Sequence, residues 1–136
     1  MTKPMGSYIK TDNDYMADKV GLRLAHLPAR GEIRVLDCFA GTGRIWKAVK
    51  RRIPKREIKV LGMDKRKIGF NLPGDNLAWL VEMDLSGFNV IDLDAYGIPY
   101  DQLKIIFDRG FHGVVYVTFI QTGFGQFSYG MLEDIG

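Results

Sequence analysis

The ten residues DCFAGTGRIW, Asp37 to Trp46, decide the fold of this chain. They begin inside a short apolar run, Ile33 to Phe39, that is typical of a buried strand. They end inside a periodic apolar and basic run that is typical of a helix and stops at Pro54. Gly41 and Gly43 lie at the junction, where glycine lets the backbone turn tightly and approach a ligand. A strand, a glycine turn and a helix in this order predict one unit of a parallel α/β sheet.

The rest of the chain continues this alternation. Helices are expected at 12–27, ended by Pro28, and at 100–109. Strands are expected at 58–64, 78–83, 88–93 and 113–120, a loop at 71–75, and a short helix at 129–135. Alternating strands and helices imply right-handed crossovers and a mostly parallel sheet covered on both faces. Ligands of such sheets bind outside the carboxyl ends of the strands, so functional residues are expected there.

Length and composition bound the class of protein. The 136 residues, 46% apolar and 26% charged, fit one globular domain over residues 1–136. Cys38 is the only cysteine and His26 and His112 lie far apart, which excludes an intrachain disulfide and argues against a metal site. The first ten residues lack a signal-peptide core, and the longest apolar run, 114–120, is too short to cross a bilayer. We therefore expect a cytoplasmic protein with no membrane partner.

The charges are segregated along the chain. Residues 1–67 carry 17 Lys and Arg against 7 Asp and Glu, whereas residues 68–136 carry 2 against 9. This asymmetry suggests a face that attracts polyanions. The candidate nucleic-acid-binding residues lie on the helix after the glycine turn and in the following loop: Lys47, Lys50, Arg51, Arg52, Lys55 and Arg56. A merely solvated helix face explains the same residues equally well.

The glycine turn differs from that of a dinucleotide-binding protein. A pyrophosphate-binding fingerprint requires a third small residue three places after Gly43, and this chain has Trp46 there. Asp37 stands at the end of the strand, where a carboxylate would repel a pyrophosphate but suits a ligand with a positive or hydrogen-bond-donating group. An NAD-linked enzyme is therefore disfavoured.

The segment from Val35 to Gly43 resembles the first motif of class I S-adenosylmethionine-dependent methyltransferases, in the Asp-x-Phe-x-Gly-x-Gly form of enzymes that act on nucleic acid bases. With the later strands, the resemblance covers roughly residues 12–122. It implies a Rossmann-like three-layer αβα sandwich with strand order 3-2-1-4-5. It also implies that the cofactor S-adenosylmethionine is held at its amino acid end by Asp37, Phe39, Gly41 and Gly43.

Two further acids match later cofactor positions. Asp64 ends the second strand, 23 residues after Gly41, where a carboxylate accepts the hydroxyl protons of a ribose. Asp84 follows the expected strand at 78–83, and the resemblance implies that it accepts a hydrogen bond from the adenine amino group. Asp75 and Glu82 are nearby competitors for that role.

The end of the fourth expected strand carries the predicted catalytic residues, Asp94 and Tyr96. The segment from Asp92 to Pro99 is similar to the Asp-Leu-Asp-Pro-Tyr-Gly-x-Pro segment of tRNA guanine-N2 dimethyltransferases, except that Ala95 replaces the first proline. The resemblance implies that Asp94 orients the target amine and that Tyr96 stacks on the base. A structural turn at a strand end is the alternative interpretation.

These observations predict a methyltransferase domain that acts on an exocyclic nitrogen of an RNA or DNA base, with RNA preferred. A non-catalytic Rossmann-like binding module or partner subunit is the alternative. The roughly 16 residues after Ile120 are too few for the last two strands of the full methyltransferase fold. The strand at 114–120 would then be an exposed edge, which suggests a truncated chain, a second copy of the chain or a partner chain.

Overall fold

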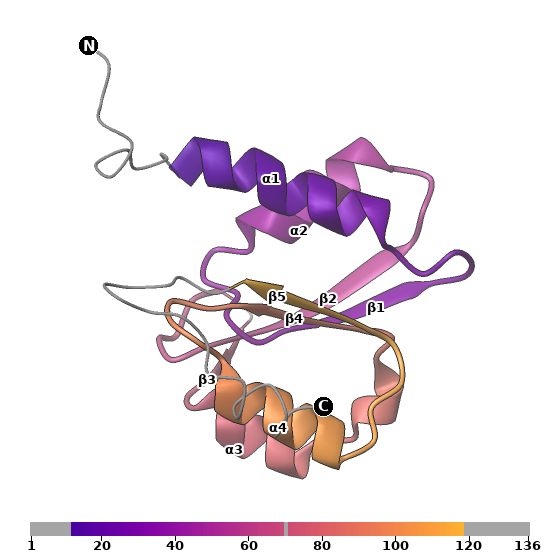
Figure 1. Cartoon of the computed structure of the whole chain (residues 1–136). Coiled ribbons are helices and arrows are strands. Elements are labelled where there is room, and N and C mark those ends of the chain that lie inside the picture. Colours follow the sequence, from indigo (N-terminus) through magenta and orange to yellow (C-terminus); the bar gives the residue numbers. More distant parts are fainter. Residues whose placement is uncertain (1–11, 70, 119–136) are drawn as a thin grey trace, which may run out of the picture.

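The computed structural model describes residues 12–69 and 71–118. Strands and helices alternate along most of this part of the chain (Figure 1). The helices are α1 (Asp12–Ala25), α2 (Arg44–Arg52), α3 (Asn76–Glu82) and α4 (Tyr100–Asp108), and one 3-10 turn spans Leu85–Gly87. The strands are β1 (Ile33–Asp37), β2 (Ile58–Asp64), β3 (Leu72–Pro73), β4 (Val90–Asp94) and β5 (Val114–Thr118).

The five strands form one parallel sheet in the order β3-β2-β1-β4-β5. Helices α1 and α2 cover one face of the sheet and α3 and α4 cover the other (Figure 1). The predicted Rossmann-like αβα fold with strand order 3-2-1-4-5 is therefore confirmed. Because all strands are parallel, their carboxyl ends share one edge, which is called the carboxyl edge below.

Side chains that alternate along the central strands build a separate core on each face. Ile33 and Val35 of β1 belong to the core beneath α1 and α2, together with Trp46 and Val49 of α2. Leu36 of β1 belongs to the other core, with Ile91 and Leu93 of β4 and Ile106 of α4. Apolar residues on both faces of these strands explain why the sheet is sandwiched between two helical layers.

The prediction of a third strand at 78–83 is wrong, because these residues lie mostly in helix α3 rather than in the sheet. Asp75 begins this helix, since its carboxylate accepts a hydrogen bond from the backbone N–H of Leu77 at 2.9 Å. The actual third strand, β3, is only two residues long, lies in the expected loop, and pairs with Met63 and Asp64 of β2. A short apolar run does not distinguish a strand from a buried helix, and here the capping Asp decides for the helix.

The other elements agree with expectation within a few residues. Strand β4 spans Val90–Asp94 instead of 88–93, and α1 ends at Ala25, three residues before Pro28. Strand β5 pairs with β4 and stands at one end of the strand order. The end of the expected strand at 113–120 and the expected helix at 129–135 lie outside the described residues.

Candidate functional site

The glycine turn between β1 and α2 is held from two sides. Gly41 and Gly43 have φ values of 53° and 77°, a left-handed region that favours glycine. The N–H of Gly41 donates to Oδ2 of Asp64 at 3.0 Å, and Nδ2 of Asn71 donates to the carbonyl of Gly41 at 2.8 Å. The loop after β1 is thus held by the last residue of β2 and by Asn71, which follows that strand.

Gly62 of β2 lets this turn pack closely on the sheet. A Cβ atom at position 62 would lie 2.7 Å from the Cβ of Ala40, which real side chains do not tolerate. The N–H of Ala40 also donates to the carbonyl of Met63 at 2.9 Å. The close approach of β2 to the turn therefore requires glycine at position 62.

Asp64 ends β2 beside the turn. Its Oδ1 accepts hydrogen bonds from the backbone N–H and Nε of Arg66, at 2.9 and 3.1 Å. Partial burial raises the pKa of Asp64, but the hydrogen bonds from Arg66 and Gly41 outweigh it, and the pKa lies below its ordinary value. The carboxylate is therefore ionised, and one of the two partners on Oδ1 is an exposed side chain that a competing ligand could displace.

A buried ion cluster lies beneath α1, at the carboxyl edge of β1 and β4. Its members are Lys19 and Arg23 of α1, Asp37 of β1, and Asp92 and Asp94 of β4. Nε and Nη2 of Arg23 donate to the two oxygens of Asp92, each at 2.8 Å, and both side chains are almost completely buried. This paired, two-bond geometry is the arrangement in which an arginine and a carboxylate tolerate burial.

Two aromatic residues complete the surroundings of this ion pair. Nε1 of Trp46 donates to Oδ2 of Asp92 at 2.7 Å. The guanidinium of Arg23 lies 5.2 Å from the ring centroid of Tyr116, and the Tyr116 hydroxyl donates to the carbonyl of Arg23 at 3.1 Å. Burial raises the pKa of Tyr116 to about 12, so this hydroxyl keeps its proton. Trp46, the residue that departs from the dinucleotide fingerprint, is thus a core residue and a hydrogen-bond donor.

Asp94, the predicted catalytic residue, pairs with Lys19. Nζ of Lys19 lies 3.0 Å from both carboxylate oxygens, and its hydrogen bond goes to Oδ2. Oδ1 of Asp94 is buried and accepts no hydrogen bond from the described residues. The carboxylate that is expected to orient a target amine therefore has one unused acceptor atom and one cationic neighbour.

Asp37 is 5% exposed, and its Oδ1 also has no hydrogen-bond partner among the described residues. Burial, together with the charge of Asp92, raises the pKa of Asp37 well above its ordinary value. The buried ion cluster contains three carboxyl groups but only two cations, so a proton on Asp37 balances its charge. A ligand that brought a third positive charge would balance it without that proton.

A cavity of about 520 Å³ opens at the carboxyl edge next to these residues. It is called the edge cavity below. Asp64 directly precedes Lys65, one of its lining residues, and Asp94 directly precedes another, Ala95. The lining comes from four segments: Phe39; Lys65; Gly74, Asp75, Asn76 and Leu77 at the start of α3; and Ala95, Tyr96, Ile98, Pro99 and Gln102 from the loop after β4 and from α4.

Three polar side chains of the edge cavity, Asp75, Asn76 and Gln102, form hydrogen bonds within the protein. Nδ2 of Asn76 donates to the carbonyl of Cys38 at 2.8 Å, and Nε2 of Gln102 donates to Oδ1 of Asn76 at 2.9 Å. Asp75 uses one oxygen to cap α3. These bonds tie the segment after β1, α3 and α4 together, and the two amide side chains line the same cavity as Phe39.

Asp84 does not belong to this group of residues, which corrects its expected place beside the cofactor. Because residues 76–82 form a helix that carries the chain back from the carboxyl edge, Asp84 lies at the opposite edge, before β4. There its Oδ1 accepts from the N–H and hydroxyl of Ser86 at 3.0 and 2.6 Å. These hydrogen bonds lower the pKa of Asp84. Asp75, its competitor in the sequence, is the acid that reaches the edge cavity.

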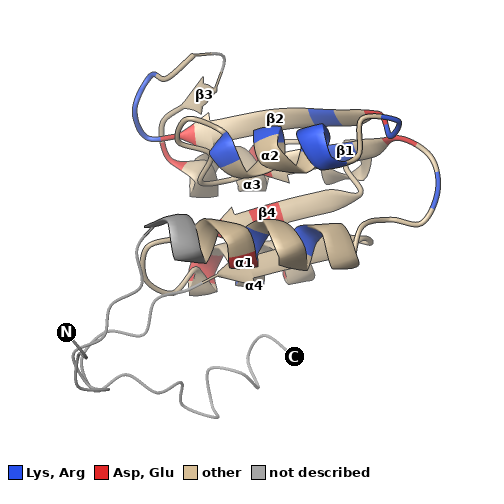
Figure 2. Cartoon of the chain, turned by 90° about the horizontal axis from the view of Figure 1, so that it is seen from above, with Lys and Arg blue, Asp and Glu red and all other residues tan. Residues whose placement is uncertain are grey.

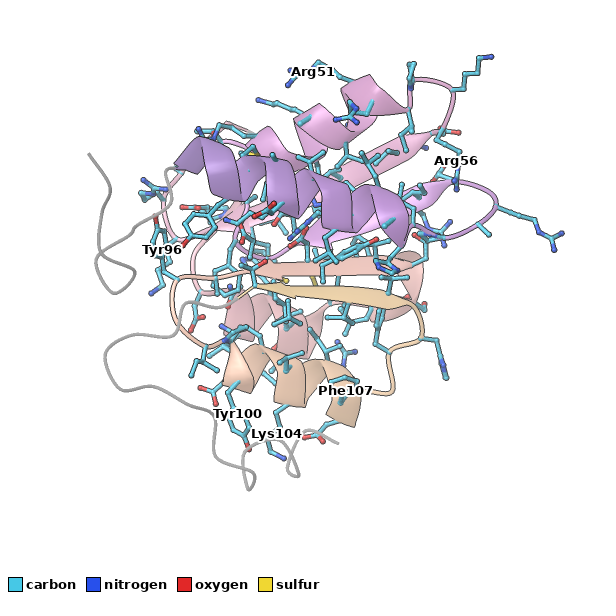
Figure 3. All side chains as sticks on the ribbon, turned by 45° about the horizontal axis from the view of Figure 1, so that its top comes forward. Arg51, Arg56, Tyr96, Tyr100, Lys104 and Phe107 are labelled. Atoms are coloured by element: carbon cyan, nitrogen blue, oxygen red, sulfur yellow. The ribbon has the colours of Figure 1, made fainter. Side chains whose placement is uncertain are left out.

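Tyr96 stands in the loop after β4 and is 93% exposed (Figure 3). Ala95, which replaces a proline of the similar segment, donates its N–H to the carbonyl of Thr118 at 3.2 Å. A proline has no N–H and could not make this bond to β5. Sheet pairing with β5 therefore fixes the backbone at Ala95, in place of the rigid ring that the resemblance would supply.

The basic residues of the central region divide into two groups. Lys47, Lys50, Arg51, Arg52 and Lys55 are exposed on α2 and the loop after it. Arg56 is different, because its Nη2 donates to the carbonyls of Pro28 and Gly31 at 2.8 and 3.0 Å. The structure therefore gives Arg56 a role in anchoring the loop after α1, and removes it from the freely exposed basic residues.

Sequence reasoning missed the contribution of α1. Lys19 and Arg23 are four residues apart and so lie on one face of a helix, and Asp92 and Asp94 are two apart and so lie on one face of a strand. Two acids on one face of a buried strand require cations nearby. Two basic residues on one face of a helix could supply them, and this pair of patterns was the signal in the sequence. No comparable pattern marks Asn71, Asn76 or Gln102, whose roles depend on contacts between distant segments.

Within residues 12–69 and 71–118, no group of three or more His, Cys, Asp or Glu side chains is arranged to hold a metal ion. No helix in the same part of the chain is both long and apolar enough to cross a membrane. A comparison with protein-family profiles gives no match, and a comparison with curated proteins gives none either.

Proposed function

We propose that this chain is an S-adenosylmethionine-dependent methyltransferase domain that acts on an exocyclic nitrogen of a nucleic acid base. One observation carries the proposal: the glycine turn and three acids, Asp37, Asp64 and Asp94, gather at the carboxyl ends of three adjacent strands, β2, β1 and β4. This is the place where open α/β sheets bind ligands. The resemblance of the glycine turn and of the segment after β4 to base-modifying methyltransferases agrees with it.

The residues at this edge fit the cofactor. Its amino acid end carries an ammonium group, and the unpartnered oxygen Oδ1 of Asp37 is suited to a positive group in a cluster that lacks one cation. Asp64 is ionised and suits the ribose hydroxyls, with the exposed Arg66 side chain as the group they would replace. The edge cavity, with Phe39, Asn76 and Gln102, would accommodate the adenine, and Asp75, which lines it, would take the role expected for Asp84.

The cofactor would supply the methyl group, whose bond to sulfur breaks as its bond to the target nitrogen forms. Asp94 would accept a hydrogen bond from the target amine through Oδ1 and then take up its proton. Tyr96, nearly fully exposed beside the edge cavity, would stack on the face of an unpaired base. Holding the amine in line with the methyl group accounts for most of the rate enhancement in such a reaction.

Binding of S-adenosylhomocysteine, measured by isothermal titration calorimetry, tests the cofactor half of this proposal. The expected result is binding by the wild-type chain and a loss of roughly tenfold or more in Asp64→Ala, which removes charge-assisted hydrogen bonds. Asp84→Ala is the matched control, since it removes an acid at the opposite edge and should bind like wild type. No binding at millimolar concentration, or an equal loss in both variants, would refute the proposal.

A non-catalytic binding module is the second candidate function, and one contact favours it. Lys19 already pairs with Asp94, which reduces the ability of that carboxylate to accept a target amine. Transfer of a radiolabelled methyl group to bulk tRNA and to DNA separates the two candidates. Incorporation that is lost in Asp94→Asn, with cofactor binding retained, excludes the module; binding without any transfer supports it.

The proposal extends to where the protein works and what it contacts. The single cysteine, Cys38, is buried, and burial raises the pKa of its thiol well above the ordinary value, which suits a chain in a reducing cytoplasm. The edge strand β5 is the candidate surface for a second copy or a partner chain. RNA is preferred over DNA as the substrate.

A further inference from the structure

Exposed basic side chains gather on α2, on the loop after it and on the loop after β2, and they are called the basic tract below. Nine residues form it, all exposed: Arg44, Lys47, Lys50, Arg51, Arg52 and Lys55 on α2 and its following loop, and Lys65, Arg66 and Lys67 after β2. Figure 2 shows these two groups on α2 and on the loop that leads from β2 to β3. The second group was not among the predicted nucleic-acid-binding residues.

The charges on α2 are not explained by the fold. Among the described residues, no acid forms an ion pair with any of the six basic residues of α2 and its loop. Arg44 and Lys47 are three apart and Lys47 and Arg51 four apart, so like charges are neighbours on the helix surface and destabilise it. Lys59 shows the usual solution, since it lies 3.4 Å from Glu32 and 3.6 Å from Glu57. Basic residues without acidic partners on one helix lower the stability of the fold. We therefore expect them to serve another purpose, which is binding of a negatively charged ligand.

The basic tract leads away from the candidate site. Arg44 begins α2 directly after Gly43, and Lys65 lines the edge cavity directly after Asp64. From there the nine residues of α2 extend the charges by about 14 Å along the outside of the sheet, at about 1.5 Å per residue. This length spans two or three phosphates of an extended strand, so one polyanion could contact α2 and still reach the cavity.

The opposite side of the molecule has no such tract. Figure 3 shows Arg51 on the outer side of α2 and Lys104 on α4, on the other side of the sheet. Lys104 lies 3.6 Å from Asp108, its partner one turn further along the helix. Arg109, at the end of α4, forms no ion pair among the described residues either, but its Nη1 donates to the carbonyls of Leu80 and Met83. Within this part of the chain, the α3 and α4 side therefore carries no group of exposed basic side chains comparable to the basic tract.

We propose that the basic tract binds the phosphate backbone of the nucleic acid substrate and directs the strand along α2 to the edge cavity. This inference rests on the proposed function and adds a path and a direction to it. Phosphates on α2 position the strand without reading its sequence. Tyr96, on the far side of the glycine turn from Lys65, then receives a base from a strand that is already anchored.

Fluorescence anisotropy with labelled single-stranded RNA, single-stranded DNA and duplexes of the same length tests this proposal in the full chain. The variant Arg44→Gln/Lys47→Gln/Arg51→Gln removes three charges from the outermost face of α2. It should weaken single-strand binding on the order of 10- to 100-fold and reduce the slope of log K against log salt by about 2. The RNA and DNA arms show which backbone the basic tract prefers.

The matched control Arg30→Gln/Lys59→Gln/Lys104→Gln removes three charges elsewhere and gives the same net charge. It should change affinity no more than about twofold to threefold. Equal losses in both triple variants would overturn the proposal, because net charge alone would then explain binding. So would tighter tract-dependent binding to phosphatidylserine vesicles than to any nucleic acid. Calorimetry with S-adenosylhomocysteine should give wild-type affinity in both variants, so a failure of cofactor binding is recognised separately.

Discussion

The two faces of the sheet differ in what they bury. Beneath α3 and α4, the core consists of apolar side chains and the Cys38 thiol. Beneath α1 and α2, the core also holds a charged pair, Arg23 and Asp92, and the carboxyl group of Asp37. Strand β4 belongs to both faces, because Ile91 and Leu93 point one way and Asp92 and Asp94 the other.

This difference indicates how the fold divides its tasks. The core beneath α3 and α4 is apolar and supplies stability through packing. The α1 and α2 side holds buried charges, which cost free energy unless each is paired. Such groups are expected where binding or catalysis requires them, and this side also carries the basic tract.

The largest effect is expected for Asp92→Asn. This change leaves the buried Arg23 guanidinium without its carboxylate, which should lower the free energy of unfolding by about 3–5 kcal/mol. Ile91→Val, the neighbouring residue on the other face, should cost only about 0.5–1.5 kcal/mol. Urea denaturation measures both. If Asp92→Asn fails to fold, Asp92→Asn/Arg23→Met should recover folding, because it removes both buried charges; equal costs in the two single variants would contradict the comparison.

A smaller, pH-dependent effect is expected for Asp37→Asn. Burial raises the pKa of Asp37, so the folded state keeps a proton that the unfolded chain releases above about pH 4. The stability that comes from this raised pKa is complete below about pH 4 and is lost as pH rises towards the folded-state pKa. Wild type should therefore become less stable relative to Asp37→Asn as pH rises, by at most about 1.4 kcal/mol per pH unit.

For Asp64→Asn, the stability difference from wild type should change with pH in the opposite direction, so this variant serves as the control for Asp37→Asn. The pKa of Asp64 is lowered in the folded state, so its contribution is present above about pH 4 and disappears as pH falls. Unfolding free energies at about pH 3, about pH 5 and about pH 7.5 compare the two slopes, because the Asp64 difference changes below about pH 4 and the Asp37 difference above it. A stability difference between wild type and Asp37→Asn that does not change with pH would show that Asp37 is ionised in the folded protein.

The sequence predicts the parts of the fold that depend on local patterns. The glycine turn and the central strands are local patterns, and they predict a mostly parallel sheet covered on both faces. The prediction of a third strand at 78–83 also came from a local pattern, but this error changes the expected position of a distant residue. A strand at 78–83 would end at the carboxyl edge, whereas helix α3 carries the chain back, so this one error moves Asp84 to the wrong edge of the sheet.

The polar contacts of the site depend on pairs that are distant in the sequence. Lys19 and Asp94 are 75 residues apart, and Asn71 and Gly41 are 30 apart. Each residue alone has no distinctive neighbourhood in the sequence. Asp37 and Asp94 are predicted as ligand-binding residues from their strand ends, but the excess of carboxyl groups around them is visible only once α1 is packed on the sheet.

The smallest effects concern the outer surfaces, and there one substitution should have opposite signs on the two sides. On α2, Lys47→Glu places an acid between Arg44, Lys50 and Arg51 and near the helix N-terminus, which should stabilise the fold by about 0.5 kcal/mol. On α4, Lys104→Glu loses the ion pair with Asp108 and sets two acids four residues apart, which should destabilise it by a similar amount. Urea denaturation at low salt measures both, and high salt should reduce both differences. If Lys47→Glu destabilises the protein as much as Lys104→Glu does, the basic charges of α2 contribute to the fold, and their unpaired state no longer argues for a bound polyanion.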